Sequence, residues 1–195
     1  MFIDITKNIN TQTKVYNGDP QYFVSKAFSI CNGDEFNVSK IEMGSHFATH
    51  IDAPKHFFDD GADVAQLNIN LICGKCRVVS VRQAIDEAFL KMLKLEPKSR
   101  ILFKTEEKYG ITKDGAKYIT DLELMVVGTD SMDIEDSSNE DFCCHKILLG
   151  YGIPIIEGLE LCHIKDGEYR LICLPLKMDG LDGVPVRVVL EEENK

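Results

Sequence analysis

The stretch HFATHIDAPKH, residues 46–56, decides how this part of the chain folds, because its pattern suits one backbone conformation better than another. Its three histidines and its aspartate all occupy even positions: His46, His50, Asp52 and His56. Side chains of an extended chain alternate between two faces, so all four would point the same way, with residues i and i+2 roughly 6.5 Å apart. A helix would also pair His46 with His50, but Gly44 and Pro54 disfavour a long helix. The pattern therefore predicts an extended segment with one ionisable face.

That face has the chemistry of a divalent metal site. Neutral imidazole and carboxylate groups are ligands for Zn²⁺ or Mn²⁺, and a site with only three or four protein ligands leaves a position open for water, as catalytic sites do. The alternative is that the histidines form hydrogen bonds within a polar loop. Grouping several ionisable side chains without a ligand costs desolvation and repulsion, so the metal site is the favoured interpretation.

Length and composition favour one globular domain over residues 1–195. The chain has 44% hydrophobic and 28% charged residues, a balance that can build a core without disulfides. A net charge of −10 argues against nucleic acid as a partner, because phosphate binding needs clustered Lys and Arg. No segment approaches about 18 consecutive apolar residues and the first residues do not resemble a signal peptide, so we expect a soluble, cytoplasmic protein with no membrane partner.

Seven cysteines in mostly apolar surroundings are typical of buried, reduced thiols and fit a reducing compartment. Cys73 and Cys76 form a CxxC pair and leave a thiol-redox or structural-zinc function open. Redox proteins place such a pair at a helix N-terminus, whereas this pair lies in the strand-like run CGKCRVVSV, residues 73–81. A four-cysteine zinc site needs a second pair, and Cys143 and Cys144 have the wrong spacing. A metal-dependent enzyme remains the favoured class.

Hydrophobic periodicity predicts a mixed α+β domain with more strand than helix. Amphipathic spacing favours a helix over residues 83–95, and a second helix over 139–149 would start at a Ser138 cap and stop at Gly150. Residues 17–20 have the composition of a turn. Apolar and β-branched runs predict strands near residues 2–6, 23–30, 36–41, 73–81, 100–104, 122–127, 153–156, 169–174 and 186–190.

Other ionisable residues are harder to interpret. His145 lies in the second predicted helix, and Glu157 ends the apolar run IPIIE. A carboxylate at the end of an apolar strand is costly unless something pairs with it, but each of the two could also be an ordinary helix or strand-end side chain. Spacing alone does not bring them to the histidines. The acidic residues between 130 and 141 are interpreted as a solvated loop before the helix, in preference to another cation site.

HFATHIDAPKHF resembles the signature of the metal-dependent cyclase-like hydrolases, a family that includes bacterial kynurenine formamidase (arylformamidase) and isatin hydrolase. The family pattern is His, three residues, His, one residue, Asp, one residue, Pro, one residue, His, and all five fixed positions are present. The resemblance extends in family order over nearly the whole chain. It includes VYNGDP (15–20), GTDSMDI (128–134), CHKILLGYGIPIIEGL (144–159) and LPLKMDGLDGVPVR (174–187).

The resemblance implies a centre of one or two divalent ions, with zinc expected and manganese as the alternative. Carried over by position, the metal ligands are His46, His50, Asp52, His145 and Glu157. The first two belong to one ion, the last two to the other, and Asp52 bridges. His56 becomes the catalytic acid/base residue, and Tyr16 becomes the aromatic wall over the substrate. The family fold implied is a compact domain of mixed sheet and helices, commonly a homodimer or higher homo-oligomer.

The implied activity is metal-dependent hydrolysis of a small aryl or cyclic amide. The favoured reaction is that of an arylformamidase, N-formylkynurenine to kynurenine and formate, a step of tryptophan catabolism. An isatin hydrolase-like reaction and a noncatalytic metal-binding protein are the alternatives. Three positions depart from the family: Asn17 stands for a proline, Ala48 for a glycine and Gly158 for an asparagine, and the chain has no Trp. These departures leave the metal ligands intact and the substrate open.

Overall fold

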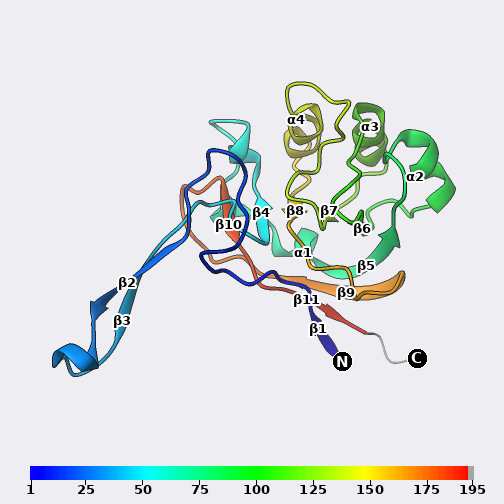
Figure 1. Ribbon diagram of the computed structural model, residues 1–195. Helices are drawn as coiled ribbons and strands as arrows, with labels where there is room; N and C mark the ends of the chain where they lie inside the picture. Colours follow the sequence, from blue (N-terminus) through cyan, green and yellow to red (C-terminus); the bar gives the residue numbers. More distant parts are fainter. Residues whose placement is uncertain (193–195) are drawn as a thin grey trace.

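A curled, mixed β-sheet organises the chain. The computed structural model describes residues 1–192, and the nine strands of this sheet follow the order β1-β11-β9-β5-β6-β7-β8-β4-β10 (Figure 1). β5, β6, β7 and β8 pair in parallel, and the other pairs are antiparallel. The strands are β1 (Phe2–Asp4), β4 (His50–Asp52), β5 (Cys73–Ser80), β6 (Arg100–Lys104), β7 (Val126–Thr129), β8 (Ile155–Glu157), β9 (Gly167–Cys173), β10 (Gly183–Pro185) and β11 (Val188–Glu191).

Three helices cover one face of the parallel strands. α2 (Glu87–Leu93), α3 (Lys113–Asp121) and α4 (Cys143–Gly150) connect these strands and lie above them in Figure 1, whereas the short α1 (Ile69–Ile72) precedes β5. One hydrophobic core lies between the helices and the sheet, and a second lies within the curl of the sheet. Because the parallel strands are buried on both faces, they read as continuous apolar runs in the sequence. The expected mixed class is confirmed.

Two elements in the helical layer differ from expectation. The helix expected over 83–95 is shorter, because Asp86 accepts a hydrogen bond from the backbone N–H of Phe89 (2.7 Å) and starts α2 there. The strand expected over 122–127 begins only at Val126, and the unexpected α3 precedes it. Gly115 weakens the helical pattern of α3, yet packing requires it: an added Cβ would lie 2.2 Å from the backbone oxygen of Ile85.

The helix expected over 139–149 also starts elsewhere. α4 begins at Cys143, after Phe142 in the left-handed conformation (φ 51°), and Ser138 does not cap it. The Ser138 hydroxyl donates to Asp136 instead (2.6 Å). The first turn of α4 receives its acceptor from the Glu135 carboxylate, which accepts the backbone N–H of His145 at 2.9 Å. A side chain distant from the helix start therefore replaces the expected local cap.

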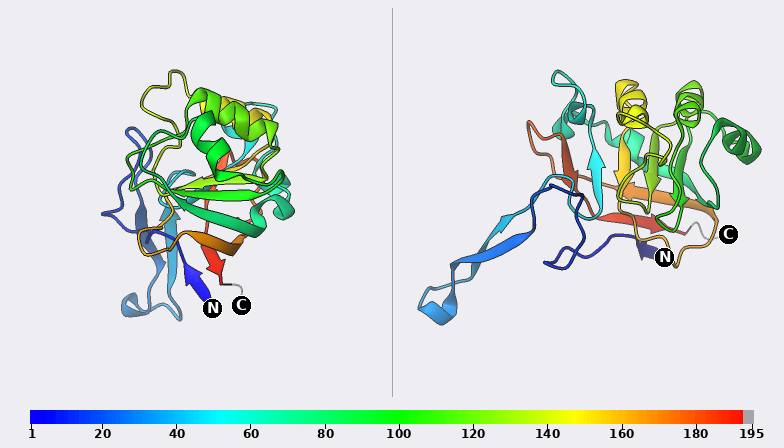
Figure 2. Two further views of the ribbon diagram at one scale, coloured as in Figure 1. Left: turned by 90° about the vertical axis from the view of Figure 1, so that its right-hand side faces the viewer. Right: turned by 45° about the horizontal axis from the view of Figure 1, so that its top comes forward.

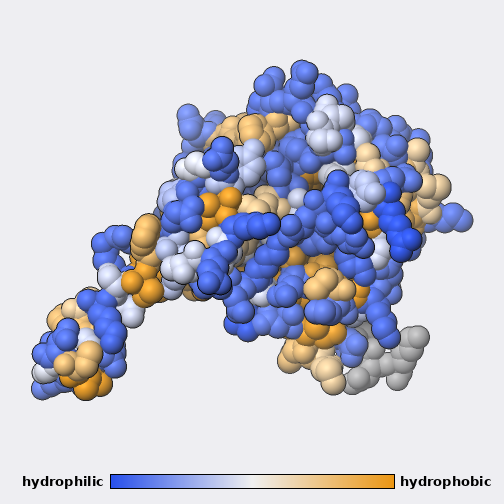
Figure 3. All heavy atoms as spheres, in the orientation of Figure 1, coloured by the Kyte–Doolittle hydropathy of each residue, from blue (hydrophilic) through white to orange (hydrophobic). Residues whose placement is uncertain are grey.

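A separate two-stranded hairpin projects from the body of the molecule (Figures 1 and 2). It consists of β2 (Phe23–Phe28) and β3 (Val38–Glu42), paired antiparallel, and every residue of both strands is exposed. Apolar side chains nevertheless gather along it (Figure 3). We call this hairpin, residues 22–43, the arm. Within residues 1–192, no helix has the length and apolar character needed to cross a bilayer.

Candidate metal centre

The strand β4 places two ligand candidates beside a third. β4 pairs antiparallel with β8 so that His50 stands opposite Glu157, and Asp52 lies on the same face of β4 as His50. All three side chains are buried. Because β7 and β8 run parallel, their carboxyl ends meet at one edge of the sheet, which is where parallel sheets commonly bind ligands. The strand register alone therefore brings three ionisable groups together at the edge of the sheet where parallel strands commonly bind ligands.

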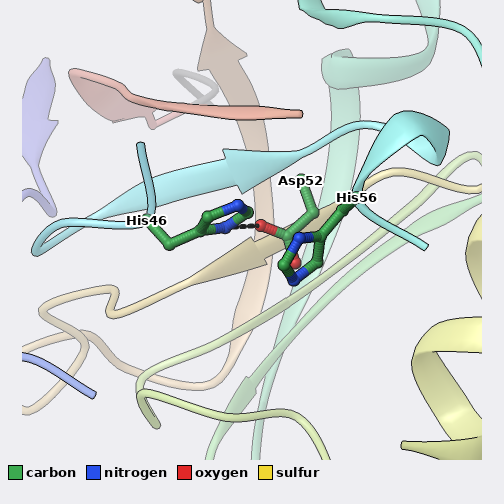
Figure 4. A group of neighbouring side chains, drawn as sticks. All are labelled: His46, Asp52 and His56. Atoms are coloured by element: carbon green, nitrogen blue, oxygen red, sulfur yellow. Dashed lines mark hydrogen bonds and ion pairs between the residues drawn. The ribbon is translucent and has the colours of Figure 1, made fainter. Parts of the chain in front are cut away.

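The extended face expected for residues 46–56 is realised only over β4. Ala48 has a left-handed backbone (φ 58°), and Pro54–His56 form a 3-10 helix, so both flanking histidines leave the strand direction. Their rings nevertheless turn toward the Asp52 carboxylate (Figure 4). His46 Nδ1 lies 2.8 Å from Asp52 Oδ1, and the ring centroids of His46 and His56 are 4.0 Å apart. Turns, rather than strand alternation, collect these residues.

His145 of α4 completes the cluster. The Nε2 atoms of His50 and His145 face different oxygens of Glu157, each at 3.4 Å. Asp52 spans the same two rings: its Oδ1 lies 3.3 Å from His50 Nε2, and its Oδ2 lies 3.9 Å from His145 Nε2. The structure thus brings together all the ligand candidates named from the sequence, with His56 beside them.

Hydrogen bonds behind the rings determine which nitrogen each imidazole presents. Glu135 Oε1 lies 2.9 Å from His145 Nδ1, and the Ala48 carbonyl oxygen lies 3.1 Å from His50 Nδ1. With Nδ1–H donating to these acceptors, the Nε2 atoms of both rings face the carboxylates and are the nitrogens that a metal ion would take in place of their protons. This is the arrangement typical of metal-binding histidines, in which an outer acceptor fixes the ring orientation.

The ionisation of the cluster reflects the same contacts. Burial disfavours the charged form of His50, but ion pairing with Asp52 and Glu157 outweighs burial and raises the pKa of His50 to about 10. The carboxylates around His145 raise its pKa to about 11 against the same effect of burial. Burial is likewise outweighed at Asp52, whose pKa is held well below its usual value, and at Glu157, whose pKa is lowered. The carboxylates therefore stay ionised and require positive charge beside them.

One atom of the cluster has no partner. Asp52 is fully buried, and its Oδ2 accepts no hydrogen bond from any residue within 1–192. A buried carboxylate oxygen without a hydrogen-bond donor is costly, because it has lost its hydrogen bonds to water and gained none from the protein. The imidazole and carboxylate groups around this oxygen are the metal ligands that suit Zn²⁺ or Mn²⁺. The residues present therefore fit a divalent metal.

The cluster opens into a pocket of about 550 Å³, a volume suited to a small molecule. Tyr16 is among the residues that line the pocket. Phe57 and Phe142 also line it, with ring centroids 5.1 and 6.0 Å from that of His145. Sequence reasoning missed both phenylalanines, because nothing in their local pattern distinguishes them from core residues.

Sequence reasoning also missed Asp182, in the loop before β10. Its Oδ2 lies 2.7 Å from His46 Nε2 and 3.5 Å from His56 Nδ1, so it holds one ligand candidate and the acid/base candidate. The ring of His46 packs flat against Gly183, where an added Cβ would lie only 2.5 Å from Cε1 of the ring.

Burial lowers the pKa of His56. The neutral form of this histidine is therefore favoured at neutral pH.

The interpretation of residues 130–141 as a solvated loop is wrong for several members. Asp130 is buried, and its carboxylate accepts hydrogen bonds from Thr105 and from the backbone N–H of Glu106, so its role is structural. Glu135 holds His145, as described above. Asp133 lines the pocket, and burial raises its pKa. The missed signal is position, since these acids directly follow β7, at the same sheet edge as the cluster.

The CxxC pair lacks the surroundings of a redox site. Cys73 and Cys76 lie in the strand β5 rather than at a helix N-terminus, and both pack against the same hydrophobic core. Burial raises the pKa of the Cys76 thiol to about 12, which keeps it from being a nucleophilic thiolate. The geometry therefore favours the metal centre as the functional site.

A curled mixed sheet here holds a buried imidazole and carboxylate cluster beside an aromatic pocket, and this set of side chains fits the class of metal-dependent enzymes. The Cyclase family model ("Putative cyclase") matches residues 3–136. A kynurenine formamidase of Bacillus mycoides (strain KBAB4) is 31% identical, over 97% of this chain and 96% of the relative. The chain therefore belongs to the Cyclase family.

Solved structures agree with this assignment. "The Structure Of Potential Metal-Dependent Hydrolase With Cyclase Activity" superposes with a TM-score of 0.86 at 30% identity, covering 100% of this chain and 99% of the other. Isatin hydrolase A from Labrenzia aggregata also gives a TM-score of 0.86, over 97% of this chain and 93% of its own. At 17% identity, that second likeness shows a shared fold.

Proposed function

We propose that this protein is a metal-dependent arylformamidase that hydrolyses N-formylkynurenine to kynurenine and formate, and so acts in tryptophan breakdown. The kynurenine formamidase relatives support this reaction, since they match over nearly the full length of both chains. The observation that carries the proposal is the buried Asp52 carboxylate between His50 and His145, whose Oδ2 accepts no hydrogen bond within residues 1–192, because it calls for a cation at the floor of an aromatic pocket.

In this proposal His46 and His50 would hold one ion, His145 and Glu157 would hold the other, and the Asp52 carboxylate would serve both. Zinc is the expected ion and manganese the alternative. A bound divalent ion supplies Lewis acidity, which lowers the pKa of water from about 15.7 toward about 7 and polarises a carbonyl oxygen. The buried carboxylates offset the added positive charge, since both are ionised in the cluster.

His56 is the proposed proton carrier. Expulsion of an arylamine from a tetrahedral intermediate requires a proton on the leaving nitrogen, and a positioned histidine can deliver it. Asp182 lies 3.5 Å from His56 Nδ1, so the Nε2 atom remains available to the pocket. Because the pKa of His56 is lowered by burial, the ring is neutral at neutral pH and can first accept the proton that it later donates.

The pocket walls suit an aryl substrate. Phe57 and Phe142 flank the His145 ring and present apolar faces close to the metal ligands, where an aromatic ring would exclude water. A cyclic amide such as isatin offers a similar flat ring, and the shared fold with isatin hydrolase keeps that reaction as the second candidate. The two differ in the reacting group, a formamide against a ring lactam.

The test is hydrolysis by apoprotein reloaded with zinc or manganese, with N-formylkynurenine and isatin as parallel substrates. We expect metal-dependent release of formate from N-formylkynurenine at a rate well above that of isatin opening. The reverse ratio would replace the formamidase by the cyclic-amide reaction. Inactivity on every aryl amide with both metals would remove the formamidase function.

The seven free cysteines support a cytoplasmic location.

We also propose that the protein is a homodimer in which the arm packs on a second copy of the chain. An isolated two-stranded hairpin is marginally stable, and exposed apolar patches mark interaction surfaces. The exposed apolar residues of the arm include Phe23, Val24, Phe28, Phe36, Val38 and Ile41. At the base of the arm, Tyr22 packs on Phe47 with ring centroids 6.0 Å apart, so a copy bound there would lie next to the metal centre.

Light scattering tests this assembly. Val24 and Ile41 are cross-strand neighbours on one face, so the double substitution Val24→Lys, Ile41→Lys should convert dimer to monomer. Ser25→Lys adds one charge on the opposite face and serves as the control. A parent protein that runs at the mass of a single chain at micromolar concentration would overturn the proposal.

A further inference from the structure

The two sides of Asp52 offer unequal ligands. Its Oδ1 faces the imidazoles of His46 and His50, whereas its Oδ2 faces His145. On that second side, one oxygen each of Asp133 and Glu157 and one nitrogen of His145 all lie within 4.8 Å of one another. One side is therefore rich in imidazole, and the other is rich in carboxylate.

The chain around Asp133 holds its carboxylate in place. Asp133 Oδ1 accepts the backbone N–H of Glu135 (2.8 Å), and the backbone N–H of Ile134 donates to Glu157 Oε1 (2.8 Å). Glu135 in turn holds the Nδ1 of His145. Three consecutive residues after β7 thus each act on the same side of the cluster, which is more than a solvated loop requires.

The unpartnered atom gives independent support for a cation on this side. Asp52 Oδ2 is fully buried, accepts no hydrogen bond within the described chain, and lies 3.9 Å from His145 Nε2. The carboxylates of Glu157 and Asp133 add two more oxygen donors beside the same imidazole, which together form a ligand set that suits a hard divalent ion.

We propose that Asp133 is an additional ligand of the ion held by His145 and Glu157, and that this carboxylate-rich side is the tighter of the two for a hard divalent ion such as Mn²⁺. The inference rests on the proposed two-ion centre. Carboxylate oxygens suit Mn²⁺, whereas imidazole suits Zn²⁺, so the side formed by His46 and His50 should favour zinc. Asp133 would thus set the metal preference of one position without changing the other.

The experiment measures metal binding without turnover. Apoprotein is titrated with Mn²⁺ while the electron paramagnetic resonance signal of the free ion is followed, and Zn²⁺ binding is measured by equilibrium dialysis. The variants are Asp133→Asn and Asp133→Ser, both of which keep an oxygen that can accept the N–H of Glu135. Asp136→Asn is the matched control, since it removes the same charge three residues away and, within residues 1–192, its carboxylate accepts only from Ser138.

We expect the parent and Asp136→Asn to bind Mn²⁺ with one tight equivalent and one weaker equivalent. Both Asp133 variants should weaken the tight equivalent about tenfold or more and leave one zinc equivalent unchanged. Unchanged Mn²⁺ affinity in both variants would overturn the role of Asp133 and leave the hydrolase intact. A folded parent that binds neither ion would instead overturn the proposed function itself.

Discussion

Gly183→Ala tests whether the metal centre depends on the close packing of His46 against β10. An added Cβ would lie 2.5 Å from His46 Cε1, 2.9 Å from Nδ1 and 3.0 Å from Nε2. Carbon atoms pack at about 3.5–4.0 Å, so the ring must move by about 1 Å. The ring cannot move freely, because Asp52 and Asp182 hold its two nitrogens at 2.8 and 2.7 Å.

The expected cost follows from these contacts. Overpacking of this kind destabilises by about 1–3 kcal/mol, and we expect that loss in the free energy of unfolding of the metal-free protein. Displacing His46 should also weaken binding of the ion on its side by about 10–100-fold, since misplacing a ligand resembles the loss of its outer support. Gly183 lies in a strand, so the alanine backbone itself adds no strain.

Urea unfolding and zinc titration of four proteins measure both effects: the parent, Gly183→Ala, His46→Ala and the double variant. If the methyl group acts through the ring, adding it to His46→Ala should cost less than about 0.5 kcal/mol, which leaves a coupling energy of about 0.5 kcal/mol or more. An equal cost of the methyl group with and without the imidazole would refute the packing argument and point to a defect in the strand itself.

Three further outcomes are expected. His56→Ala should keep its metal but lose about 10²–10⁴-fold in turnover, and hydrolysis at the parental rate would contradict its role as proton carrier. Asp52→Asn should lose metal, and full occupancy by elemental analysis would contradict the bridging role. In metal-free protein, the raised pKa values of His50 and His145 mean that the folded state binds more protons than the unfolded state above about pH 6.5. Urea unfolding should therefore show stability falling from pH 6.5 toward pH 10, whereas metal affinity should rise over the same range, because the bound ion displaces these protons.

The sequence predicts β5 and β6 closely, because burial on both faces leaves apolar runs such as Arg100–Lys104, which matches β6. The strand expected over 122–127 overlaps β7 only at its last two positions. It predicts the helices less well. Gly115 conceals α3, and α4 receives its first acceptor from Glu135 rather than from Ser138. Both differences come from tertiary contacts, which local periodicity does not contain. The arm is predicted as strands, but its projection from the body depends on pairing that leaves both of its faces uncovered.

The site residues likewise fall into a group that the sequence predicts and a group that it does not, and this difference has a physical cause. Three ligand candidates, His46, His50 and Asp52, stand close together in one motif because the short β4 and its flanking turn must deliver them to one point, so spacing reveals them. The other two, His145 and Glu157, come from distant segments, and only the family resemblance indicates them. The carboxylates that hold the imidazole rings of the ligand candidates need only contact a ring nitrogen. Any segment of the chain that passes close to a ring can supply such a carboxylate. Glu135 reaches His145 from 10 positions away and Asp182 reaches His46 from 136 positions away. Because such supports are selected by position in the fold, acidic residues that directly follow a buried parallel strand are better candidates than acidic residues elsewhere, and Asp133 and Glu135 satisfy that criterion.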